Sequence, residues 1–429
     1  MIFIYNLLLP LAFLFFIPGL IIKYRNRGGW KSTFAERFGR FSHKRVEELK
    51  EFHGAIWIHS VSVGETVIAL GFVKRYLERY PEQKFVISTT TTTGQELART
   101  RCPGNTAVIF CPIDFKYMVR RALDVIKPRQ LVIFETEIWP NLLCEASKRG
   151  IPVSLVNGRM SDHSSKGYRR ARFFFSPVLK RLALISVQTQ ADKDRYLSVS
   201  PSANVVVAGN MKFDQTPPEN IGSPGLDGYF GEGEFVVILG ASTHPGEEEL
   251  ISDVYAQLKK EFSNLKLVLV PRHAERGADI AESLNTKGYS CVRRSQAEKA
   301  ETPVDILLAD TTGEMFKFIN ASDIVIMGKS LAGHDEGHNL IEPAILDKPV
   351  VTGSVLRNFR FIQKVLQDAD ALVSVSGEQE LASALSTLVA EPQLRTEIGK
   401  RAGNAIRQHH GAMDRTIDLL KELESNQDK

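Results

Sequence analysis

The chain has 429 residues, with 54 Lys and Arg against 50 Asp and Glu, and 43% of its residues are hydrophobic. This length predicts two or three domains, and the near balance of charge with ample apolar residues excludes a disordered chain. A formal net charge of +4 does not favour a nucleic-acid-binding protein, so no nucleic-acid partner is expected. The four cysteines lack the pairing of a zinc site and the density of a disulfide scaffold, which predicts a reduced, cytosol-facing body: Cys102, Cys111, Cys144 and Cys291.

The N-terminal stretch from Ile2 to Ile22 contains no charged residue. About 20 apolar residues span a bilayer core of roughly 30 Å, so residues 1–22 are predicted to form a membrane anchor, with a buried helical hairpin as the alternative. Lys23 and Arg25 follow directly, and the positive-inside rule then places the rest of the chain in the cytoplasm. We therefore expect a single-pass anchor that holds a cytoplasmic body against a membrane.

After Gly54, short apolar runs alternate with amphipathic stretches. Continuous β-branched runs separated by helices are typical of a parallel sheet covered on both faces. A stretch rich in Pro and Gly at residues 215–234 interrupts this alternation and indicates a domain boundary. The predicted strands begin at Ala55, Lys84, Ala107, Gln130, Val153 and Ala183, and then at Phe235, Leu265, Val304, Asp323 and Pro349.

The pattern predicts two doubly wound α/β domains in series. Such domains place the loops at the carboxyl ends of their strands toward a shared cleft, which suits an enzyme that holds a nucleotide in one half and an acceptor in the other. The predicted division is an anchor at 1–22, an N-terminal acceptor-binding domain at 30–214, a linker at 215–234 and a C-terminal donor-binding domain with terminal helices at 235–425.

The first domain offers four charged candidates: Glu65, Glu135 and Glu137 follow predicted strands, and Lys212 follows the apolar run V-V-V-A-G. Glu65, in S-V-S-V-G-E, falls in the first turn of a helix, where it either acts as a general base or caps its own helix. Glu135 and Glu137, in F-E-T-E-I-W-P-N, point the same way if the chain is extended there, and Pro140 fits the first turn of the next helix. Lys212, in G-N-M-K-F-D, either neutralises a departing phosphate or is a surface lysine.

The second domain offers groups that suit a nucleotide. In L-G-A-S-T-H-P-G-E, Ser242, Thr243 and the free backbone N–H groups of a helix start form an expected anion cradle. Arg272 offers a planar fork for phosphate or carboxylate, and Glu342 is a candidate for ribose hydroxyls. Four histidines stand on different loops without the spacing or cysteine partner of a metal site, so no metal is expected: His244, His273, His334 and His338.

A basic and aromatic segment, Ser165–Arg181, reads S-K-G-Y-R-R-A-R-F-F-F-S-P-V-L-K-R. Such a segment either lies at a membrane interface and meets anionic lipid, or is a helix with an apolar core face and a solvated basic face. The sequence leaves both readings open.

Taken together and in this order, six motifs resemble those of the 3-deoxy-D-manno-octulosonic acid (Kdo) transferases, which make the inner core of lipopolysaccharide. The motifs are S-V-S-V-G-E, E-T-E-I-W-P-N, M-K-F-D, P-R-H-x-E-R, D-T-T-G-E and G-H-N-x-x-E-P-A. The resemblance runs from about Trp30 to beyond Pro349. One departure is Gly328–Lys329, where many members carry Gly-Gly.

The resemblance implies an inverting glycosyltransferase of the GT-B fold, with two Rossmann-like domains facing a cleft. Such an enzyme takes Kdo from CMP-Kdo and attaches it to a lipid A precursor (lipid IVA) at the cytoplasmic face of the inner membrane, without a metal or other cofactor. The resemblance implies that Glu65 is the proton acceptor and that Glu135 and Lys212 stabilise the transition state. CMP is then expected against Pro271, Arg272, Thr312, Gly313, Glu314, Asn339, Leu340, Ile341 and Glu342.

Two rival functions fit the predicted shape. A nucleotide-sugar 2-epimerase shares the two-domain architecture but needs no N-terminal anchor. A membrane-tethered nucleotide-binding scaffold would not need Glu65, Glu135 and Lys212 to converge.

Overall fold

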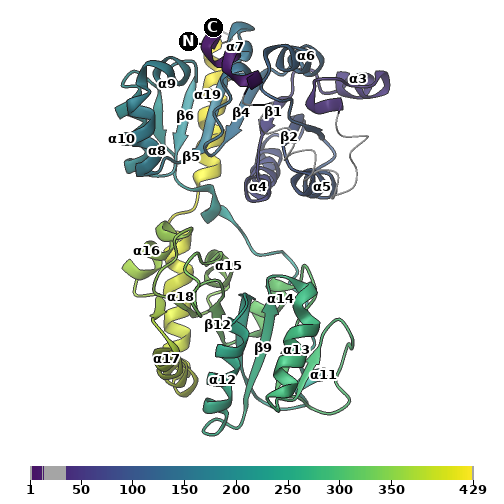
Figure 1. Ribbon diagram of the computed structural model, residues 1–429, viewed down its shortest axis with the longest axis vertical. Coiled ribbons are helices and arrows are strands. Elements are labelled where there is room, and N and C mark those ends of the chain that lie inside the picture. Colours follow the sequence, from purple (N-terminus) through teal and green to yellow (C-terminus); the bar gives the residue numbers. More distant parts are fainter. Residues whose placement is uncertain (1, 12, 14–34, 428–429) are drawn as a thin grey trace. The chain divides into compact units, whose positions relative to one another are not determined.

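The computed structural model describes residues 2–11, 13 and 35–427. It divides into two compact units, Met1–Asp214 with Gly411–Lys429 (unit 1) and Gln215–His410 (unit 2). Each unit is built on a seven-stranded sheet whose paired strands are all parallel, flanked by helices (Figure 1). This confirms the prediction of two doubly wound α/β domains.

The sheet of unit 1 has the order β3-β2-β1-β4-β5-β6-β7. Because the chain winds outward from β1 to one side and then returns to β4 on the other, the loops after β1 and β4 diverge at the centre of the sheet, where doubly wound folds bind ligands. The strands are β1 (Ile56–His59), β2 (Phe85–Thr89), β3 (Thr106–Phe110), β4 (Gln130–Phe134), β5 (Val153–Gly158), β6 (Leu184–Val187) and β7 (Val205–Val207). The helices are α3 (His43–Lys50), α4 (Val63–Arg79), α5 (Thr92–Arg101), α6 (Lys116–Ile126), α7 (Pro140–Lys148), α8 (Asp162–Arg170), α9 (Arg172–Leu179), α10 (Gln190–Val199), η1 (Met211–Asp214) and α19 (Ala412–Gln427).

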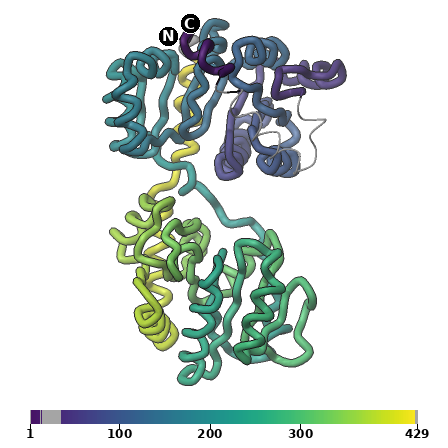
Figure 2. Tube along the Cα trace, viewed as in Figure 1, coloured from purple at the N-terminus to yellow at the C-terminus, as the bar shows by residue number. Residues whose placement is uncertain are grey.

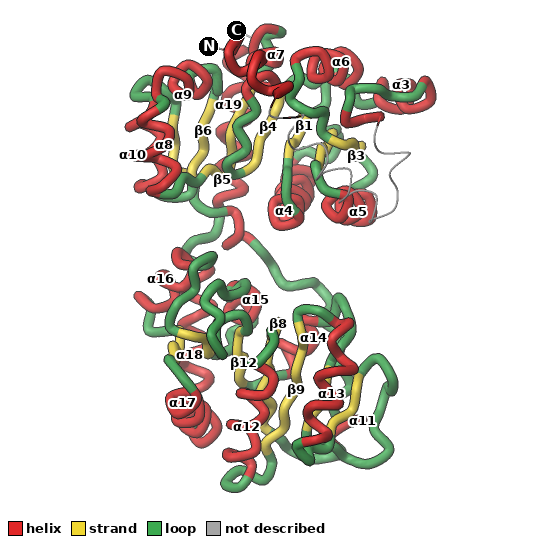
Figure 3. The backbone as a smooth tube through the Cα atoms, in the orientation of Figure 1, coloured by secondary structure: helices red, strands yellow, loops and turns green. Residues whose placement is uncertain are grey.

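Unit 2 repeats the arrangement with the order β10-β11-β9-β8-β12-β13-β14, so that its loops diverge between β8 and β12 (Figure 3). Its strands are β8 (Val236–Thr243), β9 (Leu265–Pro271), β10 (Cys291–Arg293), β11 (Ile306–Leu308), β12 (Ile324–Met327), β13 (Val350–Gly353) and β14 (Leu372–Val375). Its helices are α11 (Asp227–Phe230), α12 (Glu247–Lys259), η2 (Ala274–Arg276), α13 (Gly277–Thr286), α14 (Met315–Ala321), α15 (Ile341–Ile345), α16 (Arg360–Asp368), α17 (Glu378–Ala390) and α18 (Pro392–Arg407).

Every strand expected from an apolar run is present, but β7, β10 and β14 have no counterpart in the prediction. All three lie at sheet edges and keep side chains that are only partly buried. An edge strand pairs on one side only, so its sequence need not be continuously apolar, and β10 and β14 do contain polar residues. The strand β7 is apolar, but its three valines make a run too short to predict a strand.

The predicted division at residues 215–234 and 235–425 needs two corrections. The last helix, α19, belongs to unit 1, where Figure 2 shows it as the yellow segment at the C-terminus. Its side chains Ile417 and Leu420 join the core cluster around Phe72. Within the predicted linker, α11 buries Tyr229 and Phe230 in unit 2. The prediction assigned all terminal helices to the second domain because they follow it in the sequence. The structure places α19 against α4 and η1 of unit 1 instead.

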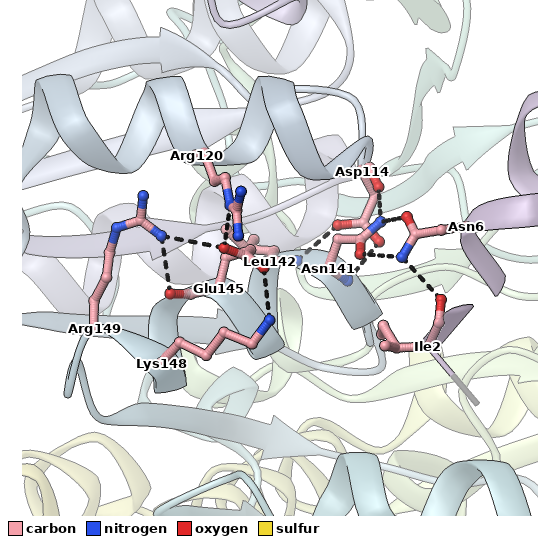
Figure 4. Close-up of polar contacts among 9 residues, drawn as sticks. All are labelled: Ile2, Asn6, Asp114, Arg120, Asn141, Leu142, Glu145, Lys148 and Arg149. Atoms are coloured by element: carbon pink, nitrogen blue, oxygen red, sulfur yellow. Dashed lines mark hydrogen bonds and ion pairs between the residues drawn. The ribbon is translucent and has the colours of Figure 1, made fainter. Parts of the chain in front are cut away.

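The described part of the N-terminal stretch, residues 2–11, is helical and docks on unit 1 through polar side chains (Figure 4). Asn6 and Asn141 exchange amide hydrogen bonds of 2.8 and 3.0 Å, and the Tyr5 hydroxyl donates to Asp114 at 2.8 Å. Most of the rest of the predicted 1–22 anchor, like Lys23 and Arg25, lies outside the described residues. Within the described residues, none of the helices has the length and apolarity to cross a bilayer.

The placement of α19 predicts the effect of a core truncation. Replacing the buried Ile417 by Ala is expected to destabilise unit 1 by about 2–5 kcal/mol, because it leaves a cavity against α4. Hydrogen–deuterium exchange should accelerate in peptides from β1, β2 and β4 while peptides from β8 and β12 stay protected. Glu422→Ala, on an exposed position of the same helix, is the control and should change stability by less than about 0.5 kcal/mol. Faster exchange in unit 2 rather than unit 1 would contradict the assignment of α19.

Candidate functional site

Glu65 lies in the first turn of α4, just after β1. Its carboxylate accepts hydrogen bonds from the Val61 N–H (2.8 Å) and the Ser62 hydroxyl (2.9 Å), while the Glu65 N–H donates to the Ser62 hydroxyl oxygen. The capping reading is therefore observed. Burial raises the pKa of Glu65 against these hydrogen bonds, and the charges of Glu135 and Glu137 raise it further. The carboxylate is thus both a cap and a group with raised proton affinity near two other acids.

Glu135 follows β4 directly and is buried. Its carboxylate accepts a hydrogen bond from Arg159 Nε at 3.1 Å and lies 3.8 Å from Lys212 Nζ. Lys212 is positioned by η1, which is held to β5 by the Met211 N–H donating to Asn157 Oδ1 at 3.0 Å. The Lys212 side chain is 33% exposed, and the structure places its ammonium within ion-pair distance of Glu135.

The backbone at Glu135 is left-handed, with φ of 57°. The expectation that Glu135 and Glu137 point the same way assumed extended chain, and this residue breaks the extension. Both carboxylates nevertheless act on Glu65, and Glu137 accepts a hydrogen bond from Trp139 Nε1 at 3.0 Å. Pro140 stands at the start of α7 as predicted. A left-handed non-glycine residue at a strand end is typical of a functional site.

Arg159 was missed by the sequence reasoning. It follows β5 in the run V-S-L-V-N-G-R, and a basic residue directly after a predicted central strand was the available signal. With it, unit 1 gathers two cations and three carboxylates beside the point where β1 and β4 diverge.

In unit 2, Arg272 follows β9, whose last residue is Pro271. The Arg272 guanidinium is exposed and makes no ion pair with any residue that the structure describes. Glu342, on α15, accepts a hydrogen bond from Asn339 Nδ2 at 3.2 Å; burial raises the pKa of Glu342, against the charge of Arg272. Arg272 after β9 and Glu342 on α15 therefore lie within electrostatic range of each other.

Leu340 and Ile341 are buried at the start of α15, and the Ile341 N–H donates to Asn339 Oδ1 at 3.2 Å. These two side chains are thus core residues that shape the loop, while the polar groups of Asn339 and Glu342 are the ones that remain for a ligand.

The turn after β11 places Thr312 and Gly313 on the surface, with Gly313 left-handed at φ of 87°. Glu314 is tied by ion pairs to Arg294 (3.2 Å) and Lys317 (3.1 Å). Burial opposes it, but hydrogen bonds from Thr311 and from these two cations lower the pKa of Glu314 to about 2. The Glu314 carboxylate is therefore engaged within the protein, so this turn offers a ligand mainly its backbone.

Two groups of the expected anion cradle around Ser242 and Thr243 are engaged within the protein. Thr243 is buried and donates to Glu248 at 2.9 Å, and the neighbouring backbone N–H groups bind the protein's own Glu247 carboxylate. The carboxylate of Glu247 accepts from the N–H groups of His244, Lys329, Ser330 and Leu331 at 2.7–2.9 Å. The Thr243 hydroxyl and the His244 N–H are thus bound by the protein's own carboxylates.

The four histidines that stand apart in sequence come together around His244. Its ring centroid lies 6.0 Å from that of His273, 5.5 Å from His334 and 5.3 Å from His338. In the part of the chain that the structure describes, no group of three or more His, Cys, Asp or Glu side chains has an arrangement that could hold a metal ion.

Known structures share this fold. A glycosyltransferase from Rickettsia africae has a TM-score of 0.59 at 13% identity over 87% of this chain and 99% of its own. A UDP-N-acetylglucosamine 2-epimerase, so described for Listeria monocytogenes, has a TM-score of 0.55 at 13% identity over 87% and 97%. The class is therefore that of the GT-B proteins, to which glycosyltransferases and these epimerases both conform.

Comparison with sequence relatives distinguishes the glycosyltransferases from the epimerases. Residues 32–215 match the family model of 3-deoxy-D-manno-octulosonic-acid transferase (kdotransferase). The chain is 30% identical over 395 residues to the transferase of that name from Haemophilus influenzae, covering 91% of each protein. It is 31% identical over 409 residues to that of Bordetella pertussis, covering 93% of each. The chain belongs to the Kdo transferase family and is a glycosyltransferase.

The ion pairs of Glu314 predict that the difference in stability between the wild-type protein and a Glu314→Gln variant depends on pH. A pKa of about 2 in the folded state, below the ordinary 4.5, means that Glu314 stabilises the fold above pH 4.5 and that this contribution is lost as the pH falls toward 2. Glu314→Gln is expected to lower the free energy of unfolding by about 1 kcal/mol at pH 7, discounted for its partial exposure. Urea unfolding should show the difference shrinking below pH 4. The exposed Glu301→Gln is the control, and a difference that is constant with pH would contradict the assignment.

Proposed function

We propose that this chain transfers Kdo from CMP-Kdo to a lipid A precursor, lipid IVA, with inversion at the anomeric carbon, as a step of lipopolysaccharide inner-core synthesis. Family membership supports the sugar and the reaction class. The single observation that supports the mechanism is the gathering of Glu65, Glu135 and Lys212 beside the diverging loops of unit 1.

The acceptor hydroxyl must lose its proton as it attacks the anomeric carbon. Glu65 is proposed as the base, since two hydrogen bonds fix its carboxylate and leave lone pairs for the hydroxyl proton. Its raised proton affinity suits that role better than an ordinary surface carboxylate would. Glu135 is proposed to orient Lys212 and Arg159, whose positive charges stabilise the negative charge that develops on the departing phosphate.

The donor is proposed to bind unit 2. Arg272, which has no ion-pair partner among the described residues, balances the phosphate charge without a metal. Asn339 and Glu342 hold the ribose hydroxyls, and the turn at Thr312 and Gly313 presents its backbone to the nucleotide.

Membrane attachment is proposed through the helix of residues 2–11 together with α9. The polar face of that helix is used in docking, while Phe3, Leu7 and Leu11 are 61–75% exposed, and Phe173 on α9 is 64% exposed. An apolar groove runs between the two helices, lined by Ile4, Tyr5, Leu8, Leu9, Ala171, Phe173 and Phe174. Exposed basic residues lie on α8, at the start of α9 and directly after α9, namely Lys166, Arg169, Arg170, Arg172 and Lys180. This combination suits the interface of an anionic leaflet, the cytoplasmic face of the inner membrane.

The base is tested by Glu65→Gln, which keeps the shape but cannot accept the proton. Transfer is expected to fall about 10²–10⁴-fold, while CMP binding measured by calorimetry changes less than about twofold. The neighbouring Glu137→Gln is the control and should keep most of the activity. Because the Glu137 charge raises the pKa of Glu65, this control should also shift the acid limb of the kcat/KM profile to lower pH. Parallel losses of CMP affinity and rate in Glu65→Gln would make Glu65 a structural residue.

The membrane surface is tested with the triple variant Phe3→Ser, Leu7→Ser, Phe173→Ser. These side chains are exposed, so the fold is expected to keep its stability while binding to phosphatidylglycerol vesicles weakens about tenfold or more. Salt at 0.5 M should weaken the binding further by screening the arginines. Val355→Ser, at a 47% exposed position of unit 2, is the control. Unchanged vesicle binding by the triple variant would remove this surface from the attachment.

A further inference from the structure

The buried carboxylate of Glu247 holds the loops after β8 and β12 together through hydrogen bonds to both. The Glu247 side chain is fully buried and accepts four backbone N–H groups, from His244 on the first loop and from Lys329, Ser330 and Leu331 on the second. A carboxylate with this many donors is firmly held. The side chains that project from the two loops are therefore fixed relative to each other where the sheet of unit 2 diverges.

Two imidazoles from these loops face each other. His244 Nε2 and His338 Nε2 are 3.1 Å apart, so only one proton can lie between them. Burial lowers the pKa of His338 to about 4, helped by the charges of Arg272, His244 and Lys329. Burial also lowers the pKa of His244. At neutral pH the pair is uncharged, and one of its two Nε2 atoms accepts while the other donates.

Lys329 stands beside this pair in a backbone conformation that a lysine rarely adopts. Its φ is 59°, in the left-handed region where glycine fits without strain. The ammonium has one long ion pair in the described structure, 3.7 Å to Glu336 Oε1, and the Lys329 charge acts on both imidazoles. An ammonium has three hydrogen-bond donors, and with one long ion pair among the described residues Lys329 can still donate to an anion.

We propose that His244, Lys329 and His338 form a subsite for the carboxylate of the donor's sugar acid, next to the phosphate site at Arg272. The proposal rests on the proposed function, because it assumes a CMP-linked sugar acid as donor. In such a donor the carboxylate and the phosphate are bonded to the same anomeric carbon. Two cations that both act on His338, one from β9 and one from β12, match two adjacent negative groups.

The carboxylate accepts hydrogen bonds from the Lys329 ammonium and from one imidazole. It also favours the imidazolium form, so that donor binding raises the proton affinity of the pair and takes up protons from solvent as the pH falls toward the pKa of His338. The charged and titratable groups that face the two rings are Glu247, His273, His334 and Lys329 around His244, and Arg272, His244, Lys329 and Glu336 around His338.

The test compares CMP with CMP-Kdo by titration calorimetry, without acceptor. Lys329→Met is expected to weaken CMP-Kdo binding about tenfold or more and to leave CMP binding within about twofold. Lys329→Gly should do the same without lowering the thermal midpoint, since glycine adopts this φ freely. Arg272→Ala is expected to weaken both ligands, and Lys364→Met, an exposed lysine on α16, to weaken neither. Wild-type titrations in two buffers of different ionisation enthalpy should show proton uptake with CMP-Kdo but not with CMP.

Equal losses for CMP and CMP-Kdo in the Lys329 variants would assign Lys329 to the phosphate and overturn the carboxylate subsite. Unchanged CMP-Kdo affinity in Lys329→Met would overturn it as well, and an absence of proton uptake would remove the imidazole pair from it. Failure of the wild-type protein to bind CMP-Kdo at all, while it still binds CMP, would instead overturn the proposed function, and the subsite with it.

Discussion

Both sheets are parallel, and this constraint shapes everything else in the molecule. Parallel strands cannot be joined by tight turns, so each must be followed by a crossover, and helices bury both faces of each sheet. The strands therefore contribute core, and the polar chemistry is confined to the loops at their carboxyl ends. In both units the first strand lies inside the sheet, next to a strand from the other half of the fold. The loops after β1 and β4 in unit 1, and after β8 and β12 in unit 2, therefore diverge and leave room for a ligand.

Buried carboxylates at these edges are stabilised in three different ways. Glu65 is held by hydrogen bonds of its own helix start and keeps a raised pKa. Glu135 is held by Arg159 and Lys212, which it in turn positions. Glu247 is surrounded by backbone N–H groups and joins two loops. The first arrangement leaves a carboxylate of raised proton affinity, the second holds two cations, and the third joins two loops. The role of a buried carboxylate at a strand end therefore cannot be assigned until its hydrogen-bond and ion-pair partners are known.

The rival functions separate on different grounds. The epimerase alternative shares the fold, as the TM-scores show, so fold does not exclude it, whereas the extended similarity to Kdo transferases does favour transfer. The scaffold alternative would not require a cationic pair fastened to Glu135 beside a carboxylate of raised pKa. The apolar N-terminal helix, residues 2–11, is hydrogen-bonded to the rest of unit 1 through Asn6 and Tyr5.

The sequence alone determined the central strands, the two-domain class and the family, because buried parallel strands are continuously apolar and the motifs follow them in order. It also placed Glu65 and Glu135 after predicted strands, where side chains of different loops converge, and singled out Lys212 after an apolar run. Only the tertiary structure decided what these groups touch. Lys212 pairs with Glu135 across more than 70 residues of chain, Arg159 joins them, and α19 packs on the first unit. The gathering of the histidines and the left-handed Lys329 were equally hidden, since contacts between loops depend on strand order and on backbone dihedrals, which local patterns do not encode.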